Sequence, residues 1–337
     1  MRRPRRTAAG ILLAAGATLA AGIQPITAIA APAGRAAPAV VHTAAASAAD
    51  HQKVRDFWTP ERMRSATPLD PPAAAPGART APRPPGPLSP VSTVAPTAPA
   101  AAPGPDTKAN PQPGGAWTGG GAVVKTSGRV FFTLGDRTAS CSGDAVTSQN
   151  GSTVITAGHC VKYQGAWHTN WTFVPAYQDG QAPYGTWSAA KTASTPQWVA
   201  SEDINYDVGT AVVAPLDGKR LADVVGAQGL QFNGAYNQEM YAFGFPAAAP
   251  YDGKRLIYCS GKTAKDFLFS KDHGMACNMT GGSSGGPWFA SFDEATGSGL
   301  QASVNSFGYT FLPNRMFGPF FGNEVKSLYE QSAAQKV

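Results

Sequence analysis

The distribution of proline divides this chain into two parts that cannot fold in the same way. Of its 29 prolines, 15 lie between Pro68 and Pro113, in a stretch otherwise dominated by alanine, glycine and threonine. Such a stretch has too few large apolar side chains to bury a core, and each proline removes a backbone donor. We therefore expect residues 31–115 to be a disordered pro-segment and linker, and residues 116–337 to be the folded domain.

One short island interrupts the first part. Thr59 precedes Pro60, and Trp58 and Met63 lie close by. Threonine can accept hydrogen bonds from free N–H groups at a helix start, where proline in the first turn loses nothing. We predict a short helix near residues 59–65, which either docks on another surface through Trp58 and Met63 or is a transient helix within the linker.

Net charge follows the same division. Residues 1–115 contain 12 Lys/Arg and 5 Asp/Glu, and residues 116–337 contain 15 and 16, so the two parts carry +7 and −1. The overall charge of +6 therefore belongs to the part that precedes the domain. A nearly neutral net charge for the domain gives no argument for binding to nucleic acid or to an anionic membrane. We expect neither as a partner.

The first 30 residues have the features of a secretory signal peptide. Several arginines within the first six residues precede an Ala/Leu/Gly-rich stretch from residue 8 to about residue 21. This stretch is shorter than the roughly 20 residues that a transmembrane helix needs. Ala28-Ile29-Ala30 then provides a small-x-small cleavage site. We predict a signal peptide over residues 1–30 and a secreted, extracellular protein, with the Sec and twin-arginine export routes both open.

All four cysteines lie in the predicted domain, at Cys141, Cys160, Cys259 and Cys277. An even number of cysteines in an exported protein predicts two disulfides, for which three pairings exist. Pairing in sequence order would close short loops, each stabilising the fold by about 3 kcal/mol. No C-x-x-C pair is present, which argues against zinc. We expect no metal and no cofactor.

The predicted domain is rich in β signals. Short apolar or alternating runs are separated by glycine, asparagine, aspartate and proline, at a spacing typical of an all-β barrel or sandwich. The runs cover residues 128–134, 153–157, 171–175, 208–213, 240–245, 256–259, 287–290 and 301–309. Helical periodicity appears near the end of the chain, where Asn323 can cap a helix that continues through Tyr329.

Three local patterns carry chemistry. His159 ends the run Thr-Ala-Gly-His, Asp207 precedes the apolar run 208–213, and Ser284 lies within Gly-Gly-Ser-Ser-Gly-Gly-Pro. Alone, each pattern has an ordinary structural interpretation, and Asp203 is an alternative to Asp207. Together they supply a nucleophilic hydroxyl, a base that accepts its proton and a carboxylate that orients the base.

The order of these residues along the chain distinguishes between scaffolds. Residues 282–286 also fit the G-x-S-x-G turn of α/β-hydrolases, but that scaffold needs a histidine after the serine, and the last histidine is His273. A subtilisin-like order would need an aspartate before His159, with helices around it, and this sequence is rich in β signals instead. The order His, Asp, Ser on a β-rich chain fits the remaining scaffold, which has two barrels.

Residues 156–160 and 282–287 resemble the signature segments of trypsin-like (chymotrypsin-fold) serine proteases, and the leader and tether resemble those of secreted actinobacterial enzymes. The resemblance implies an all-β fold of two six-stranded antiparallel β-barrels with a C-terminal α-helix. It implies that His159 is the general base, Asp207 its orienting carboxylate and Ser284 the nucleophile. The N–H groups of Gly282 and Ser284 would then form the oxyanion hole.

The resemblance also implies a substrate-binding region. Asn278 matches the pocket-floor position that is acidic in Arg/Lys-specific members, so a neutral amide there removes the reason to expect a cationic P1 residue. Asn305 matches a position that is often histidine in glutamyl-specific relatives, so that preference is unsupported too. The strand beside the pocket is matched by Asn305, Ser306, Phe307 and Gly308. The resemblance implies that Ser306 lies near the buried aspartate and that its backbone pairs with the substrate.

Ser283 occupies the position of the aspartate that receives the new N-terminal ammonium when vertebrate-type members are activated. Activation by that route is therefore not expected for this zymogen. The sequence as a whole predicts a secreted, monomeric serine endopeptidase that acts on peptide or protein substrates. Two alternatives remain open, a non-catalytic binding protein built on the protease fold and an esterase on the same fold.

Overall fold

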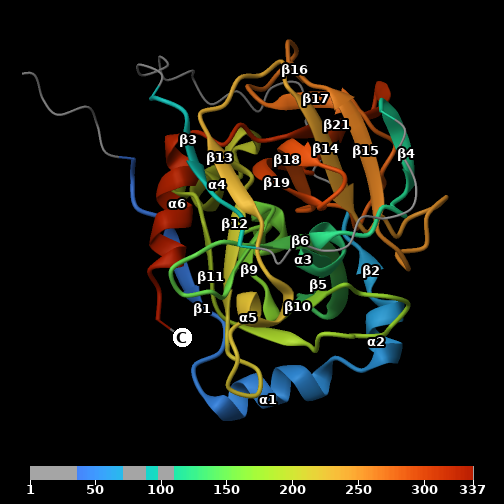
Figure 1. Cartoon of the computed structure of the whole chain (residues 1–337). Coiled ribbons are helices and arrows are strands. Elements are labelled where there is room, and N and C mark those ends of the chain that lie inside the picture. Colours follow the sequence, from blue (N-terminus) through green and yellow to red (C-terminus); the bar gives the residue numbers. More distant parts are fainter. Residues whose placement is uncertain (1–35, 71–88, 98–109, 337) are drawn as a thin grey trace, which may run out of the picture. The chain divides into compact units, whose positions relative to one another are not determined.

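The structure is a computed structural model that describes residues 36–70, 89–97 and 110–336 (Figure 1). The predicted signal peptide lies outside these residues. Residues from Ala36 onward belong to one compact unit. Within the described ranges, none of the helices combines the length and the apolar composition needed to cross a bilayer.

The first half of the domain is a closed antiparallel barrel. Its strands follow the order β11-β10-β5-β6-β7-β12, and β12 pairs back with β11 to close the ring. The barrel core contains large, fully buried side chains, among them Phe132, Trp171 and Trp187. The barrel strands are β5 (Ser127–Leu134), β6 (Arg137–Val146), β7 (Thr153–Thr156), β10 (Thr169–Pro175), β11 (Trp187–Ser194) and β12 (Gly209–Val213).

The second half consists of a seven-stranded sheet, in the order β3-β13-β19-β18-β14-β15-β4, and a four-stranded sheet, in the order β16-β17-β21-β20. Its pairings are antiparallel except for β13 with β19. The larger sheet contains β3 (Ser92–Val94), β4 (Gln112–Ala116), β13 (Gly229–Phe232), β14 (Glu239–Gly244), β15 (Ile257–Lys262), β18 (Pro287–Asp293) and β19 (Ser298–Val304). The smaller contains β16 (Ala264–Lys265), β17 (His273–Ala276), β20 (Phe307–Tyr309) and β21 (Leu312–Gly318).

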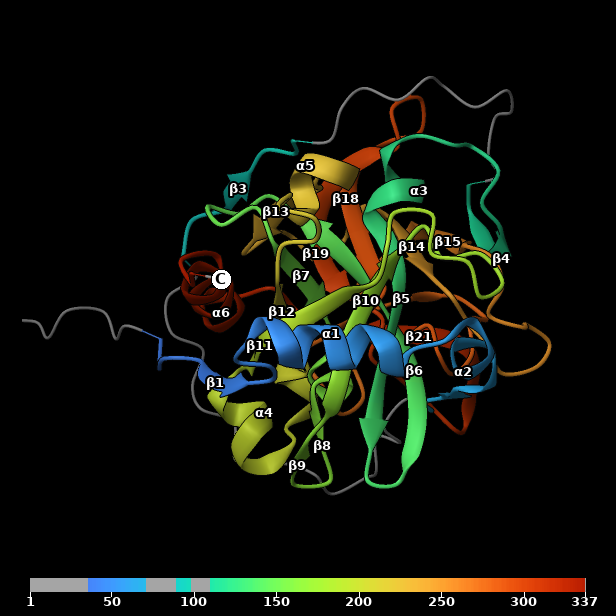
Figure 2. The same ribbon diagram turned by 90° about the horizontal axis from the view of Figure 1, so that it is seen from below.

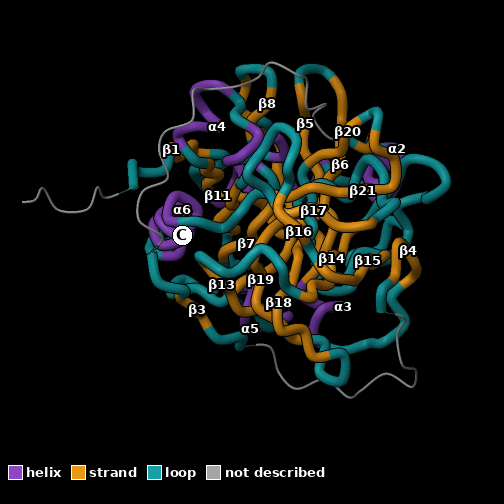
Figure 3. The backbone as a smooth tube through the Cα atoms, turned by 90° about the horizontal axis from the view of Figure 1, so that it is seen from above, coloured by secondary structure: helices purple, strands orange, loops and turns teal. Residues whose placement is uncertain are grey.

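Helices lie at the edges of this strand framework (Figure 3). The C-terminal helix α6 (Asn323–Ala333) packs Val325, Leu328 and Tyr329 against the barrel core. Its N-cap residue is Gly322 rather than the predicted Asn323, whose side chain instead bonds Ser89 and Asn233. The remaining short elements are α3 (Ala122–Thr126), α4 (Pro196–Ser201), α5 (Leu221–Val225), the 3₁₀ turns η1 (Gly158–Cys160) and η2 (Ile204–Tyr206), and the hairpin of β8 (Lys162–Tyr163) and β9 (Ala166–Trp167).

The all-β prediction with a C-terminal helix is confirmed, and each predicted β run overlaps a strand. The run 301–309 is divided into β19 and β20 at residues 305–306. The cysteines pair in sequence order, as Cys141–Cys160 and Cys259–Cys277, and the described part of the chain contains no free cysteine. This settles which of the three possible pairings the fold adopts.

The prediction that residues 31–115 are disordered apart from one short helix is wrong for the described parts. The expected helix is present as α2 (Pro60–Ser65), with Thr59 Oγ1 accepting from the Arg62 N–H at 3.3 Å. However, β1 (Val40–Thr43), α1 (Ala48–Phe57) and β2 (Thr67–Pro68) are ordered as well, and β3 and β4 join the larger sheet.

The physical reason lies in the partner surface rather than in the segment itself. β1 extends the barrel sheet beside β11, and β2 pairs with β6. Figure 2 shows α1 lying across β10 and β11. Trp58 and Met63 are 4% and 2% exposed, because the domain supplies the apolar surface that the segment lacks. Composition measures what a segment can bury alone, not what it can bury against a neighbour.

Candidate active site

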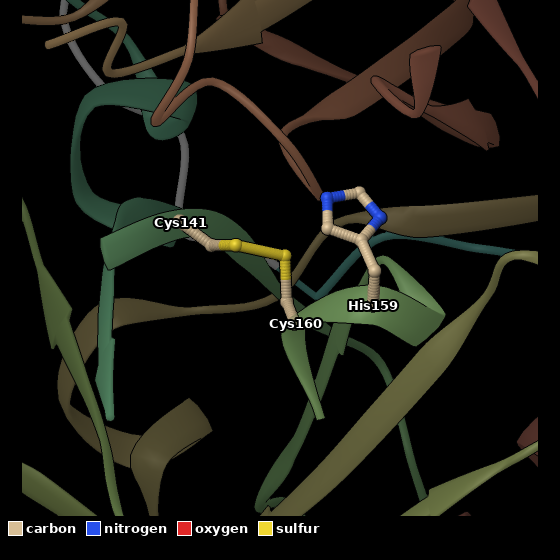
Figure 4. A group of neighbouring side chains, drawn as sticks. All are labelled: Cys141, His159 and Cys160. Atoms are coloured by element: carbon tan, nitrogen blue, oxygen red, sulfur yellow. A yellow bond between two sulfur atoms is a disulfide. The ribbon is translucent and has the colours of Figure 1, made fainter. Parts of the chain in front are cut away.

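His159 lies in η1, directly after β7. Its backbone N–H donates to Asp207 Oδ1 at 2.7 Å, and its ring Nδ1 lies 2.7 Å from Asp207 Oδ2. A carboxylate on Nδ1 fixes the tautomer in which Nε2 is free to accept a proton. The bridge from Cys160 to Cys141 ties the backbone immediately beside this histidine (Figure 4).

Asp207 is the carboxylate that reaches His159, and Asp203 is not. Asp203 accepts from the N–H and the side-chain amide of Asn205, and so caps η2. Asp207 is 0% exposed, and its Oδ2 also accepts from Ser306 Oγ at 2.6 Å. Gly158 makes this approach possible, since a Cβ there would lie 2.9 Å from Asp207 Oδ1 and 2.8 Å from the Trp198 ring.

Ser284 lies in the loop between β17 and β18, and this loop packs on the first barrel. The Ser284 carbonyl accepts from the Ser142 N–H at 2.7 Å. Gly285 has φ of +81°, and a Cβ on it would overlap Thr156 Oγ1. The loop therefore contacts the strand that leads to His159. Cys160, which directly follows His159, and Ser284 are 124 residues apart in the sequence, and the tertiary fold brings them together.

The side chains of Ser284 and His159 are both buried, at 1% and 0% exposed. Ser284 Oγ and His159 Nε2 have no hydrogen-bond partner among the described residues. A buried polar atom without a partner calls for an explanation, and a catalytic role is one such explanation. The Ser–His hydrogen bond of such sites is often long at rest and tightens when a substrate binds. The arrangement can therefore transfer a proton from the hydroxyl to the imidazole once the two atoms approach.

The predicted oxyanion donor Gly282 already has a partner. Its N–H donates to the carbonyl of Leu69 at 3.1 Å, with Gly282 held at φ of +92°. Ser142 supports the same loop, because its Oγ donates to the Gly282 carbonyl and accepts from the Phe245 N–H. Neither Leu69 nor Ser142 belongs to a recognisable sequence pattern, so sequence reasoning missed both.

The predicted binding residues have different surroundings. Asn278 Oδ1 accepts from the Tyr251 hydroxyl at 2.5 Å, and the Asn278 N–H donates to the Pro113 carbonyl. Asn305 is fully buried, and its side chain bonds the carbonyls of Phe243 and Ser283 and the Trp288 indole. The Asn305 side chain thus braces the serine loop. Phe307 is buried in β20, and Gly308 is partly exposed beside it.

A second buried histidine supports the first. Burial lowers the pKa of His168 to about 4, so its imidazole is neutral near pH 7. Its Nε2 lies 2.9 Å from the His159 carbonyl, which can only accept, so the proton is on Nε2. His168 therefore holds the backbone of His159 without adding charge. It is a supporting residue that no sequence motif indicated.

A metal does not fit the cysteine–histidine cluster at this site. Cys141, His159 and Cys160 place ligand-type atoms within 4.8 Å of one another. Both sulfur atoms, however, are joined in a disulfide. Metals bind the thiolate form of cysteine, which a bridged sulfur does not offer.

Comparison with known proteins gives one short sequence match and several structural matches. No protein-family model matches the chain. Over 73 residues the chain is 41% identical to the extracellular metalloprotease of Bacillus subtilis, a match that spans 21% of this chain and 22% of that protein. The chain therefore covers about a fifth of the length of this relative.

The structural matches cover whole chains. The protease Anisep from Arthrobacter nicotinovorans is 44% identical with a TM-score of 0.61, and the match covers 66% of this chain and 100% of that one. The thermostable serine protease AL20 from an extremophilic microorganism is 39% identical with a TM-score of 0.60, covering 64% and 100%. A Glu endopeptidase, at 15% identity and a TM-score of 0.53, matches in fold over 66% of this chain and 97% of its own.

Proposed function

We propose that His159, Asp207 and Ser284 are the catalytic triad of this chain, which belongs to the chymotrypsin-fold serine proteases and is a serine endopeptidase. The chain covers the full length of two such relatives at 44% and 39% identity. The observation that carries the proposal is the double contact of Asp207 with His159, through the ring Nδ1 and the backbone N–H. A carboxylate that holds both the ring and its backbone leaves Nε2 as the free basic atom.

The proposed mechanism is acyl transfer to serine. Ser284 Oγ attacks the carbonyl carbon of a peptide bond while its proton passes to His159 Nε2. The negative charge on the carbonyl oxygen is stabilised by the N–H groups of Gly282 and Ser284. His159 then gives the proton to the departing amine, which breaks the C–N bond and leaves an acyl-enzyme. Water attacks this ester with His159 again as base, and the proton returns to Ser284.

The substrate is a peptide or protein, as for the protease relatives. We assign the floor of the specificity pocket to Asn278, whose side chain is neutral and bonded to Tyr251. A neutral floor gives no ionic attraction to a lysine or arginine side chain. The residues beside the pocket are Ser306, Phe307 and Gly308, with Asn305 bracing the serine loop from behind.

The same proposal includes the fate of the rest of the chain. Residues 1–30 are a cleaved signal peptide, residues 31–115 a pro-segment with its linker, and residues 116–337 the secreted, monomeric protease. Two disulfides support an extracellular location, because such bonds persist in oxidising compartments. The domain charge of −1 gives no reason to expect nucleic acid or a membrane as a partner.

Labelling with a fluorophosphonate probe, which reacts with activated serines, tests the triad. We expect the processed protein to be labelled, Ser284→Ala to abolish both labelling and peptide hydrolysis, and the exposed control Ser201→Ala to leave both unchanged. An unlabelled, inactive wild-type domain would favour the non-catalytic binding protein. Hydrolysis of esters without hydrolysis of peptides would favour the esterase.

A further inference from the structure

The proposed reactive centre is closed to solvent. Ser284 is 1% exposed, and His159 and Asp207 are 0% exposed. A nucleophile that cleaves an external peptide must be reachable by that peptide. The structure therefore describes a form of the enzyme in which the site is covered. The segment that covers it is part of the same chain.

That segment is the stretch Thr67–Asp70, which follows α2. β2 runs parallel to β6, pairing Thr67 with Ala139 and Pro68 with Ser140. Leu69 then donates its N–H to the Ser140 carbonyl at 3.0 Å, and its own carbonyl accepts from the Gly282 N–H at 3.1 Å. Asp70 continues over the serine loop, since a Cβ on Gly281 would lie 2.7 Å from Asp70 Oδ1.

The contact at Gly282 has a specific chemical meaning. If this N–H stabilises the developing oxyanion, as proposed above, a carbonyl already bound to it excludes the substrate carbonyl from the same place. Removing one such donor from a serine protease reduces kcat by roughly 10²–10³. Occupying the donor with a carbonyl from the chain has the same effect on any substrate that arrives.

The Leu69 carbonyl binds the Gly282 N–H, but the Leu69 side chain does not lie where the side chain of a substrate residue would lie, in the proposed specificity pocket. Its side chain, 6% exposed, packs in the barrel core cluster that contains Cys141 and Cys160. The pocket floor Asn278 instead contacts Tyr251, which packs against a separate cluster around Met279. Because the Leu69 side chain lies outside that pocket, the Leu69–Asp70 bond is held at the site but is not presented for cleavage.

The covering segment is also anchored by residues that precede Thr67. The Trp58 indole donates to the Asn170 carbonyl at 2.6 Å, and Arg64 donates to the Asp179 carbonyl. Trp58 and Met63 pack in one cluster with three aromatic side chains of the domain, Phe131, Tyr177 and Phe245. β1 adds a four-residue pairing with β11. These contacts are independent of any covalent link to the domain.

We propose that residues 36–70 are an intramolecular inhibitor of the protease, which closes the site by placing the Leu69 carbonyl on the oxyanion donor Gly282. The proposal rests on the proposed function. Since the inhibitor is held by its own contacts, cutting the chain between residues 70 and 89 does not open the site. Activity requires that residues 36–70 dissociate or be degraded.

Labelling with the fluorophosphonate probe tests this in secreted full-length protein, where a gel separates the unprocessed from the processed band. We expect labelling of the processed band and none of the unprocessed band. Trp58→Ala combined with Met63→Ala should loosen the segment, so that the unprocessed band of this variant becomes labelled under conditions in which that of the wild type is not. Lys53→Ala, on the exposed side of α1, should behave as the wild type.

A second measurement does not depend on a destabilising variant. The inactive Ser284→Ala chain is cut between residues 70 and 89 by an added protease and passed over a size-exclusion column. We expect the fragment that begins near residue 36 to co-elute with the domain. Separate elution would overturn the proposal. In the active chain, release of a fragment that ends at Leu69 would also overturn it, because the Leu69–Asp70 bond would then be a substrate of the enzyme itself.

The two proposals fail in different ways. If both bands are labelled at the same rate, residues 36–70 do not inhibit, and the triad proposal stands. If neither band is labelled, the triad proposal fails and the inhibitor proposal fails with it.

Discussion

Ser306 Oγ lies 2.6 Å from Asp207 Oδ2, the oxygen that also lies 2.7 Å from His159 Nδ1. Ser306 lies at the break between β19 and β20 in the second half of the domain, whereas Asp207 and His159 belong to the first barrel. The hydroxyl therefore links the two halves through one buried carboxylate. Because both acceptor directions of Oδ2 are used, the carboxylate cannot rotate away from the imidazole.

Removing this hydroxyl should lower the turnover rate more than substrate affinity. A hydrogen bond to a charged group contributes about 1.5–3 kcal/mol, so Ser306→Ala should reduce kcat by roughly 10- to 100-fold with KM little changed. Ser306→Thr keeps the hydroxyl and should recover most of the loss. Steady-state kinetics on a peptide substrate measure both. A kcat for Ser306→Ala equal to that of the wild type would mean that Asp207 is held without Ser306.

The choice between the two aspartates can be tested directly. Asp207→Asn keeps the shape of the side chain but stabilises the wrong imidazole tautomer, so kcat should fall by about 10⁴. Asp203→Asn is the matched control, because Asp203 caps η2, and its kcat should stay within a few fold of the wild type. Equal losses in the two variants would contradict the assignment of Asp207.

Sequence reasoning named the candidate-site residues that lie in local patterns, and missed supporting residues, such as Ser142 and His168, that reach them through the tertiary fold. His159, Asp207 and Ser284 each lie in a short pattern whose residue types have a chemical meaning. The resemblance places Ser306 near the buried aspartate, and its hydroxyl does donate to Asp207. Asn305 was placed beside the pocket, yet its side chain supports the serine loop. Which face of a strand break a side chain occupies is decided by packing, and no spacing in the sequence records it.

The same distinction applies to the fold. The strands β6 and β11 were missed because they consist largely of serine, alanine and threonine, which give no apolar alternation even though most of them are buried. The ordered segment that precedes the domain was missed for a different reason, which is that its order depends on the domain. Residues 40–68 are poor in apolar residues, and they are ordered only because the domain offers edge strands and an aromatic surface.

The two disulfides should have separate effects on kinetics. Replacing Cys141 and Cys160 with serine should remove about 3 kcal/mol of stability and also lower kcat, since Cys160 directly follows His159. Replacing Cys259 and Cys277 should remove a similar amount of stability but act mainly on KM, because Cys277 precedes Asn278, the residue proposed for the pocket floor. Thermal unfolding and steady-state kinetics of the two double variants measure these effects. An unchanged kcat after loss of Cys141–Cys160 would show that the bridge does not position His159.

A buried carboxylate in the first barrel should make stability depend on pH. Asp144 is 0% exposed, and burial raises its pKa to about 8, although Ser127 Oγ donates to it. The folded state therefore keeps a proton that the unfolded chain loses near pH 4, so the free energy of unfolding falls as the pH rises from about 4 to about 8. Asp144→Asn is neutral throughout and avoids this loss.

Thermal unfolding of Asp144→Asn, in the Ser284→Ala background to prevent autolysis, should show this difference. The variant should match the parent near pH 4 and exceed its Tm by a margin that widens up to about pH 8 and then levels off. The control Asp136→Asn changes an exposed carboxylate at the β5–β6 turn and should show no such trend. A Tm difference for Asp144→Asn that stays constant with pH would mean that Asp144 is ionised in the folded protein over the whole range.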